Sequence, residues 1–147
     1  MSEKNKVAVR RVQEEVFSQG GNLDAVEEVY APDYVGHAPP YGDIRGTEDA
    51  KQSAATDRQA FPDLQTTIED MVAEGDKVVT RWTMRGTHQG ETEGLGPATG
   101  KRIEITGIGM YKLTDEGKIA EFWDHFDALG MMQQLGLIPK PVEQATS

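Results

Sequence analysis

The chain has no cysteine, no apolar run long enough to span a membrane and little positive charge. Without cysteine there can be no disulfide, no thiolate nucleophile and no cysteine-ligated zinc or iron–sulfur site. Only 15 Lys and Arg residues oppose 25 Asp and Glu residues, which gives a net charge of −10 and a pI near 4.7. Because such a surface repels phosphates, we expect neither nucleic acid nor a membrane as a partner.

The motifs of several common enzyme classes are also missing. The sequence contains no phosphate-binding P-loop, no G-x-G-x-x-G dinucleotide motif and no G-x-S-x-G nucleophile elbow. The three histidines, His37, His88 and His125, lack the spacing of a zinc site, so a metal site would have to be assembled by the fold. The N-terminal segment lacks the apolar centre of a signal peptide, so we expect a soluble, cytoplasmic protein.

The length of 147 residues fits a single domain, which we expect to span residues 1–147 with its core at about 5–138. Residues 139–147 have the composition of a loose tail. Valines at helical spacing predict a first helix over residues 4–19, which Gly20 and Gly21 would end. A short helix should follow, and Thr47 is the expected N-cap of a third.

Alternating and β-branched residues predict that most of the second half of the chain forms strands. The expected strands cover residues 33–37, 64–73, 77–87, 101–113 and 118–126. Four glycines and a proline make residues 88–100 a loop at the rim of the sheet. The predicted class is therefore α+β, with a curved, mostly antiparallel sheet packed on the N-terminal helices. Such a sheet would form a cone around an apolar pocket.

The last predicted strand carries the main candidate for chemistry. Its two alternating sets of side chains are Ala120, Phe122, Asp124 and Phe126, and Ile119, Glu121, Trp123 and His125. If the first set faces the pocket, Asp124 lies between two phenyl rings, where desolvation would raise its pKa toward that of a general acid or base. Alternatively, Asp124 lies on the outer face and the phenylalanines form a subunit interface. Strand parity does not decide between the two.

Two other carboxylates close to Asp124 have structural explanations. Glu121 is either a second pocket carboxylate or the partner of a basic residue such as Arg81 or Lys118. Asp127 directly precedes the expected helix over residues 128–135, where its carboxylate can accept backbone N–H bonds. Such bonds lower the pKa of a carboxyl group, so proton transfer is assigned to Asp124 rather than to Asp127.

The remaining candidates fit either a ligand site or ordinary packing. His37 and His88 border loops, where each could bind a carbonyl group at the pocket mouth or serve as a plain polar residue. Methionine, tryptophan and tyrosine side chains would suit a pocket for an apolar ligand and equally a core. Gly107 and Gly109, two apart in a strand, suggest a bend or bulge, or the close approach of another backbone.

Four sequence blocks resemble a known family in their order and spacing. They are VRRVQEEVFSQGGNLDAVEEVYAPDYVGH, AFPDL, VVTRWTMRGTHQGE and GKIAEFWDHFDALGMMQQLG. The family is that of the SnoaL-like polyketide cyclases (ester cyclases), in the nuclear transport factor 2-like fold superfamily, and the resemblance covers roughly residues 5–138. It implies a cystatin-like cone with an apolar pocket and a homodimer.

The resemblance also implies a reaction, because characterised members close a ring of an aromatic polyketide methyl ester by intramolecular aldol condensation without metal or cofactor. Their acid/base aspartate falls on Asp124, and an assisting histidine falls on Met110, so either His37 or His88 substitutes for it or the chemistry differs. We therefore expect Asp124 to be catalytic in a cyclase or isomerase acting on a small hydrophobic carbonyl compound. The expected substrate contacts are His37, His88, Met110, Trp82, Trp123, Phe122 and Phe126. The alternatives are a non-catalytic binding or dimerisation domain and an epoxide hydrolase-like hydratase.

Overall fold

The computed structural model describes residues 2–18, 22–39 and 42–139. The helices are α1 (Ser2–Arg11), the π-helical turn η1 (Val12–Val16), α2 (Ala25–Val29), α3 (Gly46–Ala60) and α4 (Ala128–Gln134). The strands are β1 (Tyr30–His37), β2 (Asp43–Arg45), β3 (Gln65–Glu74), β4 (Lys77–Thr87), β5 (Arg102–Leu113) and β6 (Ile119–Phe126). The expected helix end at Gly20 and Gly21, and the expected tail apart from Pro139, lie outside the described residues.

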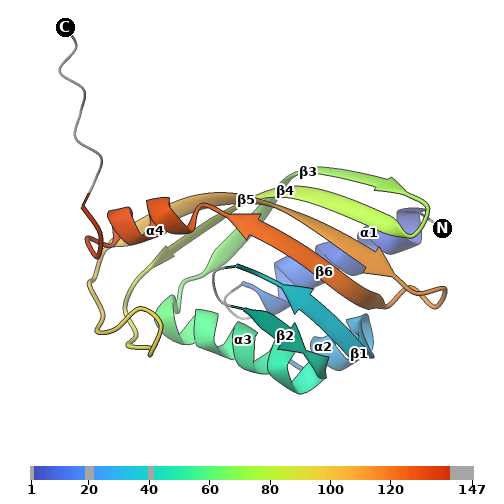
Figure 1. Cartoon of the computed structure of the whole chain (residues 1–147), viewed down its shortest axis with the longest axis horizontal. Helices are drawn as coiled ribbons and strands as arrows, with labels where there is room; N and C mark the ends of the chain where they lie inside the picture. The colour runs from blue at the N-terminus through green and yellow to red at the C-terminus, as the bar shows by residue number, and fades with distance from the viewer. Residues whose placement is uncertain (1, 19–21, 40–41, 140–147) are drawn as a thin grey trace, which may run out of the picture.

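One curved sheet with helices on one side dominates the fold (Figure 1). Its strand order is β2-β1-β6-β5-β4-β3, and every pair is antiparallel except β1 with β6. Helices α1, α2 and α3 lie below the sheet in Figure 1, whereas α4 continues from β6 at its far end. The α+β class and the curved, mostly antiparallel sheet are as predicted. Within the described ranges, no helix combines the length and apolar character needed to cross a membrane.

The segment after α2 is the main departure from the predicted elements. A short strand was predicted over residues 33–37, and β1 contains it but begins earlier, at Tyr30, and pairs in parallel with β6. The register of this pair shifts between Tyr30 and Val35, and Pro32 lies in that interval. Strand β2 was not predicted, because three residues at a sheet edge are too few to show a period.

Helix α3 connects the N-terminal helices to the sheet. It begins at Gly46 rather than with Thr47 as its cap, and the Asp49 carboxylate accepts the backbone N–H of Arg45 at 3.1 Å. Near its other end, Arg58 donates to the carbonyl oxygens of Glu15 (2.9 Å) and Val16 (2.7 Å) at the end of η1. These carbonyls lack partners within the helix, so Arg58 satisfies them and joins α3 to η1.

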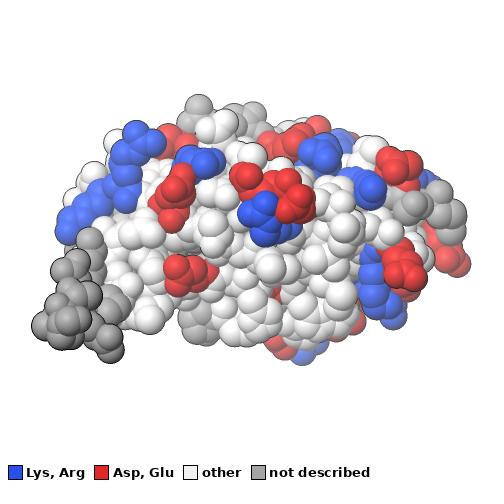
Figure 2. Space-filling model, turned by 90° about the horizontal axis from the view of Figure 1, so that it is seen from above, with Lys and Arg blue, Asp and Glu red and all other residues white. Residues whose placement is uncertain are grey.

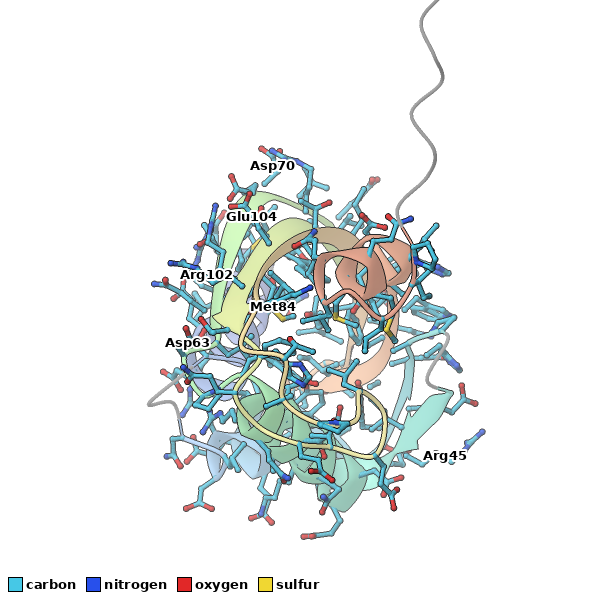
Figure 3. The ribbon with its side chains drawn as sticks, turned by 90° about the vertical axis from the view of Figure 1, so that its left-hand side faces the viewer. Arg45, Asp63, Asp70, Met84, Arg102 and Glu104 are labelled. Atoms are coloured by element: carbon cyan, nitrogen blue, oxygen red, sulfur yellow. The ribbon has the colours of Figure 1, made fainter. Side chains whose placement is uncertain are left out.

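Side chains on β4, β5 and β6 alternate between the helix-covered inner face and the outer face. Met84 points into the arc of the sheet, whereas Arg102 and Glu104 lie on its outer side (Figure 3). Gly109 of β5 is opposite Asp124 of β6, and Tyr111 is opposite Phe122. The set of β6 residues that contains Asp124 therefore faces the helices.

Gly107 and Gly109 leave space for aromatic rings on this inner face, a role that the sequence did not predict. The pairing of β5 continues through both without a register shift, so neither forms the expected bulge. A Cβ atom at Gly107 would lie 2.3 Å from the Trp82 ring, and one at Gly109 would lie 2.7 Å from the Phe122 ring. The two glycines leave room for aromatic side chains rather than for another backbone.

Two clusters of buried residues form the core. The first joins α1, η1 and α2 to the sheet through side chains such as Val12, Val26 and Tyr111. The second contains Phe61 and Trp82 and includes α4. Residues of both clusters line one cavity, which therefore lies between them.

Candidate functional site

The inner cavity has a volume of about 450 Å³ and lies between α3, η1 and the inner face of the sheet. Phe122, Asp124 and Phe126 of β6 line it, together with Trp82 and Met84 of β4. An apolar cavity with a few polar groups is the usual form of a small-molecule site. We therefore take the inner cavity as the candidate active site.

Asp124 is an ionisable group of this cavity with an altered proton affinity. The Nε1–H group of Trp82 donates to Asp124 Oδ1 at 3.3 Å. Burial raises the pKa of Asp124 to about 7, although the Trp82 hydrogen bond acts in the opposite direction. A carboxyl group with this pKa can both accept and return a proton near neutral pH.

Asp57 of α3 is a second such group, which the sequence analysis missed. It lines the same cavity, and burial followed by the negative charge of Asp124 raises its pKa to about 7. Within the described part of the chain, its carboxylate has no hydrogen-bond or ion-pair partner. A signal existed, because Asp57 lies three residues from both Ala54 and Ala60 on the buried side of α3.

Two further polar residues that line the inner cavity are Gln13 and Tyr111. Gln13 of η1 is only 5% exposed, and its Oε1 atom has no hydrogen-bond partner among the described residues. Tyr111 of β5 stacks on Phe122 with ring centres 4.3 Å apart. Burial raises the pKa of Tyr111 well above its usual value, so the phenol keeps its proton and remains a donor.

Four of the predicted site residues line the inner cavity and four do not. Those that line it are Asp124, Trp82, Phe122 and Phe126. His37, Met110 and Trp123 lie on the outer face, where Trp123 is opposite both Met110 and His37 in the strand register. The structure therefore does not support these three as contacts for a ligand in the cavity. Their strands were predicted, but not which face they occupy.

His37 is instead part of an ion-pair group on the outer face. Its Nδ1 atom lies 3.0 Å from Asp43 Oδ1 and its Nε2 atom 2.8 Å from Glu121 Oε2. Hydrogen bonds to Glu121 and then to Asp43 raise the pKa of His37. Glu121 thus pairs with His37, neither with Arg81 nor with Lys118, and Arg81 pairs with Asp70 at 2.6 Å.

His88 is fully buried but does not line the inner cavity. Its Nδ1 atom accepts the backbone N–H of Thr99 at 3.2 Å, and its ring lies 5.6 Å from that of Phe61, which does line the cavity. His88 therefore holds the rim loop against the wall of the cavity. Asp127 has the predicted capping role, since its Oδ1 atom accepts the N–H of Gly130 at 2.8 Å.

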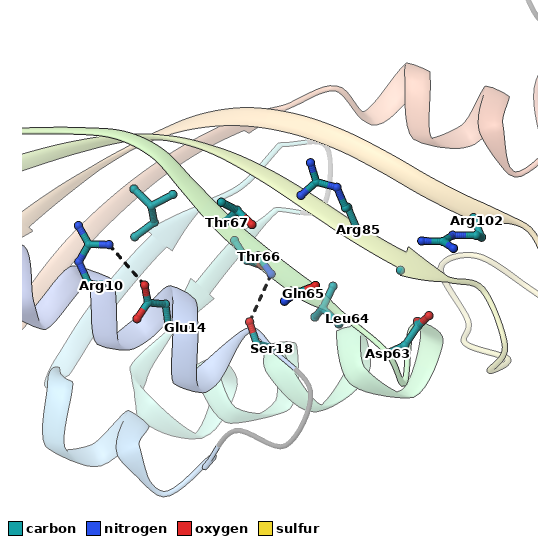
Figure 4. Close-up of a pocket in the computed structure, with 12 residues that line it drawn as sticks. Arg10, Glu14, Ser18, Asp63, Leu64, Gln65, Thr66, Thr67, Arg85 and Arg102 are labelled. Carbon is teal, nitrogen blue, oxygen red and sulfur yellow. Dashed lines mark hydrogen bonds and ion pairs between the residues drawn. The ribbon is translucent and has the colours of Figure 1, made fainter.

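A second hollow, the edge groove, lies beside β3 and has a volume of about 830 Å³ (Figure 4). Arg10 pairs there with Glu14 at 3.4 Å, and Thr66 donates its N–H to Ser18 Oγ at 3.3 Å. The groove is lined mainly by polar and charged side chains. Because altered proton affinities mark functional sites, the inner cavity with Asp57 and Asp124 is the better candidate.

Comparisons with solved structures agree with the observed fold. A proposed SnoaL-like polyketide cyclase from Jannaschia sp. CCS1 is 25% identical and has a TM-score of 0.84, with 94% of this chain and 95% of that chain covered. IdmH, a proposed polyketide cyclase from Streptomyces antibioticus, is 34% identical, with a TM-score of 0.76 and coverages of 90% and 98%. AclR, a proposed hydroxylase from Streptomyces galilaeus, is 26% identical, with a TM-score of 0.79 and coverages of 97% and 87%.

Comparison with curated proteins finds no match. The sequence model of the SnoaL-like polyketide cyclases, by contrast, matches residues 7–135, which include every strand and α4. IdmH adds a relative of 34% identity over nearly its whole length. The chain therefore belongs to the SnoaL-like polyketide cyclase family.

Proposed function

We propose that the protein is a cofactor-independent cyclase or isomerase that uses Asp124 as its general acid and base. The reaction would be an intramolecular aldol-type condensation of a polyketide-like or other small hydrophobic carbonyl compound. One observation carries the proposal: Asp124 lies in an apolar cavity that raises its pKa to about 7. Family membership supports the reaction class.

The proposed reaction needs one carboxyl group acting twice. The Asp124 carboxylate removes a proton from a carbon between an ester and a ketone, which leaves an enolate. The enolate carbon attacks a second carbonyl of the same molecule, so a carbon–carbon bond forms and that carbonyl oxygen becomes an alkoxide. Protonated Asp124 then returns its proton to the alkoxide, so the reaction needs no oxidant or reductant.

Tyr111 is the proposed donor to the enolate oxygen. The resemblance placed an assisting histidine at Met110, but Met110 faces outward, while the next residue, Tyr111, lines the inner cavity. The phenol keeps its proton at neutral pH because burial raises its pKa. Such a donor stabilises negative charge as it develops on the substrate oxygen.

Hydration is a second candidate function, favoured by one observation. A hydratase must hold a water molecule with several polar groups, and Asp57, Gln13 and Asp124 all line the inner cavity. Incorporation of ¹⁸O from labelled water into an aryl epoxide such as styrene oxide would reveal it. Incorporation that requires Asp124, without proton exchange on carbonyl compounds, would replace the cyclase proposal.

The cyclase proposal can be tested without knowing the natural substrate. Ethyl benzoylacetate has an acidic carbon between an ester and a ketone, and its exchange with deuterium in D₂O is followed by NMR. The protein should accelerate this exchange over solvent, and Asp124→Asn should lower the acceleration on the order of 10² to 10⁴ fold. Glu121→Gln, on the other face of β6, is the matched control and should keep full activity.

Two outcomes would decide against this assignment. Full activity of Asp124→Asn would remove Asp124 from the mechanism. If wild-type protein binds the ester without accelerating exchange, the protein is better described as a binding domain of the same fold. Circular dichroism of each variant establishes that a lost activity does not reflect lost structure.

We also propose that two copies of the chain pair through the outer face of the sheet, as the resemblance implies. Val72, Val79, Met110 and Trp123 are opposite one another in register on four neighbouring strands. Figure 2 shows uncharged side chains between small groups of acidic and basic residues on this face. An apolar row of this kind on an open sheet face is suited to burial against a second copy.

A further inference from the structure

The ionisable side chains of the inner cavity share one sign of charge. Asp43, Asp49, Asp57 and Asp124 line it, and no Lys, Arg or His from residues 2–18, 22–39 and 42–139 does so. Tyr111 also lines it, and burial keeps its phenol neutral. A ligand that enters this cavity therefore meets carboxyl groups but no cationic side chain of the described chain.

The four carboxylates differ in how they are compensated. Asp43 bonds to His37 at 3.0 Å and to Arg45 at 3.3 Å, while Asp49 accepts the backbone N–H of Arg45. The Arg45 side chain itself points away from the molecule (Figure 3). Asp57 and Asp124 have no cationic partner among the described residues, although Trp82 donates to Asp124.

The cationic residue next to Asp57 is engaged elsewhere. Arg58 directs its guanidinium to the backbone carbonyls of Glu15 and Val16 at the end of η1. It therefore holds α3 in place without neutralising Asp57. The inner part of the cavity keeps an excess of negative charge.

Two independent features of the lining also favour a positively charged ligand. Six aromatic rings line the cavity: Phe17, Phe61, Trp82, Tyr111, Phe122 and Phe126. The faces of aromatic rings attract ammonium groups, most strongly when water is excluded. In addition, the buried Oε1 atom of Gln13 is an acceptor without a donor in the described part of the structure.

Other charged ligands fit this lining less well. A carboxylate or phosphate would approach four aspartates without a cation to receive it. A metal ion usually needs three or more protein ligands, and no group of three or more Asp, Glu or His side chains in the described ranges is arranged to hold one. An organic cation, by contrast, can be bound by one carboxylate and surrounding rings.

We propose that the inner cavity binds a substrate that carries a protonated amine, that Asp57 pairs with the ammonium group, and that Asp124 is left free for the reacting carbon. The substrate would thus be a hydrophobic carbonyl compound with a basic nitrogen, and Gln13 Oε1 would accept one of its N–H groups. The inference deepens the proposed function in naming Asp124 as the reacting group. The assignment of Asp57 concerns binding alone.

Three probes of nearly equal shape test the charge preference: 2-naphthylmethylamine, 2-naphthalenemethanol and 2-naphthoate. Their binding to the whole chain is measured by calorimetry at pH 7.5, where the first is a cation, the second neutral and the third an anion. The amine should bind at least tenfold more tightly than the alcohol, and the anion should be weakest. Absence of amine binding, or an anion that binds as tightly as the amine, would overturn the proposal.

Substitution of Asp57 tests the position of the ammonium group. In Asp57→Asn, the affinity for the amine should fall to about the affinity for the alcohol. The affinity for the alcohol itself should not change. Asp57→Ser serves as a second variant, and Glu121→Gln, on the outer face, is the control that should retain the preference. A preference unchanged in both Asp57 variants would contradict the role of Asp57.

A proton linkage gives an independent signature of the same contact. A bound cation favours the ionised carboxylate, so amine binding should release protons from Asp57 and Asp124, and affinity should fall as pH drops from 8 to 5.5. Asp43 and Asp49 also face the cavity, and Tyr34 and Tyr111 keep their protons over this range. Amine affinity independent of pH would contradict the proposal. Because binding is measured without turnover, the amine preference and the catalytic role of Asp124 can fail separately.

Discussion

The two faces of β6 place carboxylates of the same strand in opposite environments. On the outer face, Glu121 is paired with His37 at 2.8 Å and remains about one-third exposed. On the inner face, Asp124 has no ion pair within the described chain, and burial raises its pKa to about 7. Burial without a counter-charge thus prepares a carboxyl group for proton transfer, whereas the carboxylate on the outer face serves in an ion pair.

The largest effect should come from filling the space that a glycine leaves on the inner face. In Gly107→Ala, the new Cβ would lie 2.3 Å from the Trp82 ring, which is 7% exposed and has little room to move. Overpacking of this kind costs about 1 to 3 kcal/mol, measured as the free energy of unfolding in urea. Trp82 should also shift relative to Asp124, so ligand binding should weaken.

The neighbouring residue on the outer face provides the control for this clash. Ile108 is 55% exposed, and Ile108→Val adds no volume, so its unfolding free energy should change by less than about 0.5 kcal/mol. Equal costs for the two variants would mean that the inner face is not closely packed. The difference between the faces would then rest on charge alone.

Removing a charge from the inner cavity should stabilise the protein. The folded pKa of Asp57 is about 7 against 3.8 for a free aspartate, so its ionisation costs nothing below pH 4 and the full penalty above pH 7. Asp57→Asn should therefore stabilise the fold at pH 8, on the order of 2 kcal/mol, and have little effect at pH 4. Urea unfolding at both pH values measures the change.

A surface aspartate should respond with the opposite sign. The hydrogen bond from Lys77 lowers the pKa of Asp76, so this carboxylate stabilises the fold above pH 4 and loses that contribution as pH falls. Asp76→Asn should thus destabilise slightly at pH 8, where Asp57→Asn stabilises. If both variants destabilise the fold at pH 8, the Asp57 charge is compensated in solution.

Much of the fold followed from local pattern, because period and turn signals reflect contacts within each element. The strands β4, β5 and β6 and the cap at Asp127 were predicted from such signals. The parallel pairing of β1 with β6 was not, because it joins segments far apart in sequence and leaves no local period. Which face of the sheet carries Asp124 depends on where the helices pack. Strand parity alone therefore could not assign Asp124 to the inner or the outer face.

Tertiary packing also decided which of the candidate residues line the inner cavity. Asp57 reaches the inner cavity only because α3 packs against the sheet and Arg58 joins it to η1. Residue type alone also could not separate Trp82, which lines the cavity, from Trp123, which does not. Such assignments depend on tertiary contacts rather than on the composition of a segment.

A charge placed on the apolar outer row should weaken the proposed dimer. In Trp123→Glu, a carboxylate replaces the ring that lies between Met110 and His37 in the register, and burying it against a second copy would be costly. The dissociation constant should rise tenfold or more by sedimentation. Asp76→Asn, in the turn after β3, should leave it unchanged, and a monomeric wild-type protein at tens of micromolar would refute the dimer.

The smallest effect should come from His37 on the outer face. Its pKa is raised by Glu121 and Asp43, so its contribution to stability is complete below pH 6.5 and is lost as pH rises through the raised value. His37→Gln should therefore cost a little stability at pH 5.5 and almost nothing at pH 9. Because the side chain is partly exposed and its ion pairs are screened by solvent, we expect less change than for Asp57→Asn.

Titration of Asp57 on the inner side and of His37 on the outer face thus makes the wild-type protein less stable as pH rises from 5 to 9. The two contributions are unequal. Asp57→Asn should remove a large part of this pH dependence, the raised pKa of Asp124 should preserve another part, and His37→Gln should remove only a small part. The double variant should be additive, since the two residues lie on opposite sides of the sheet and share no partner. If His37→Gln flattens the pH dependence more than Asp57→Asn does, the surface ion pair outweighs the buried carboxyl group, and the contrast between the two faces is reversed.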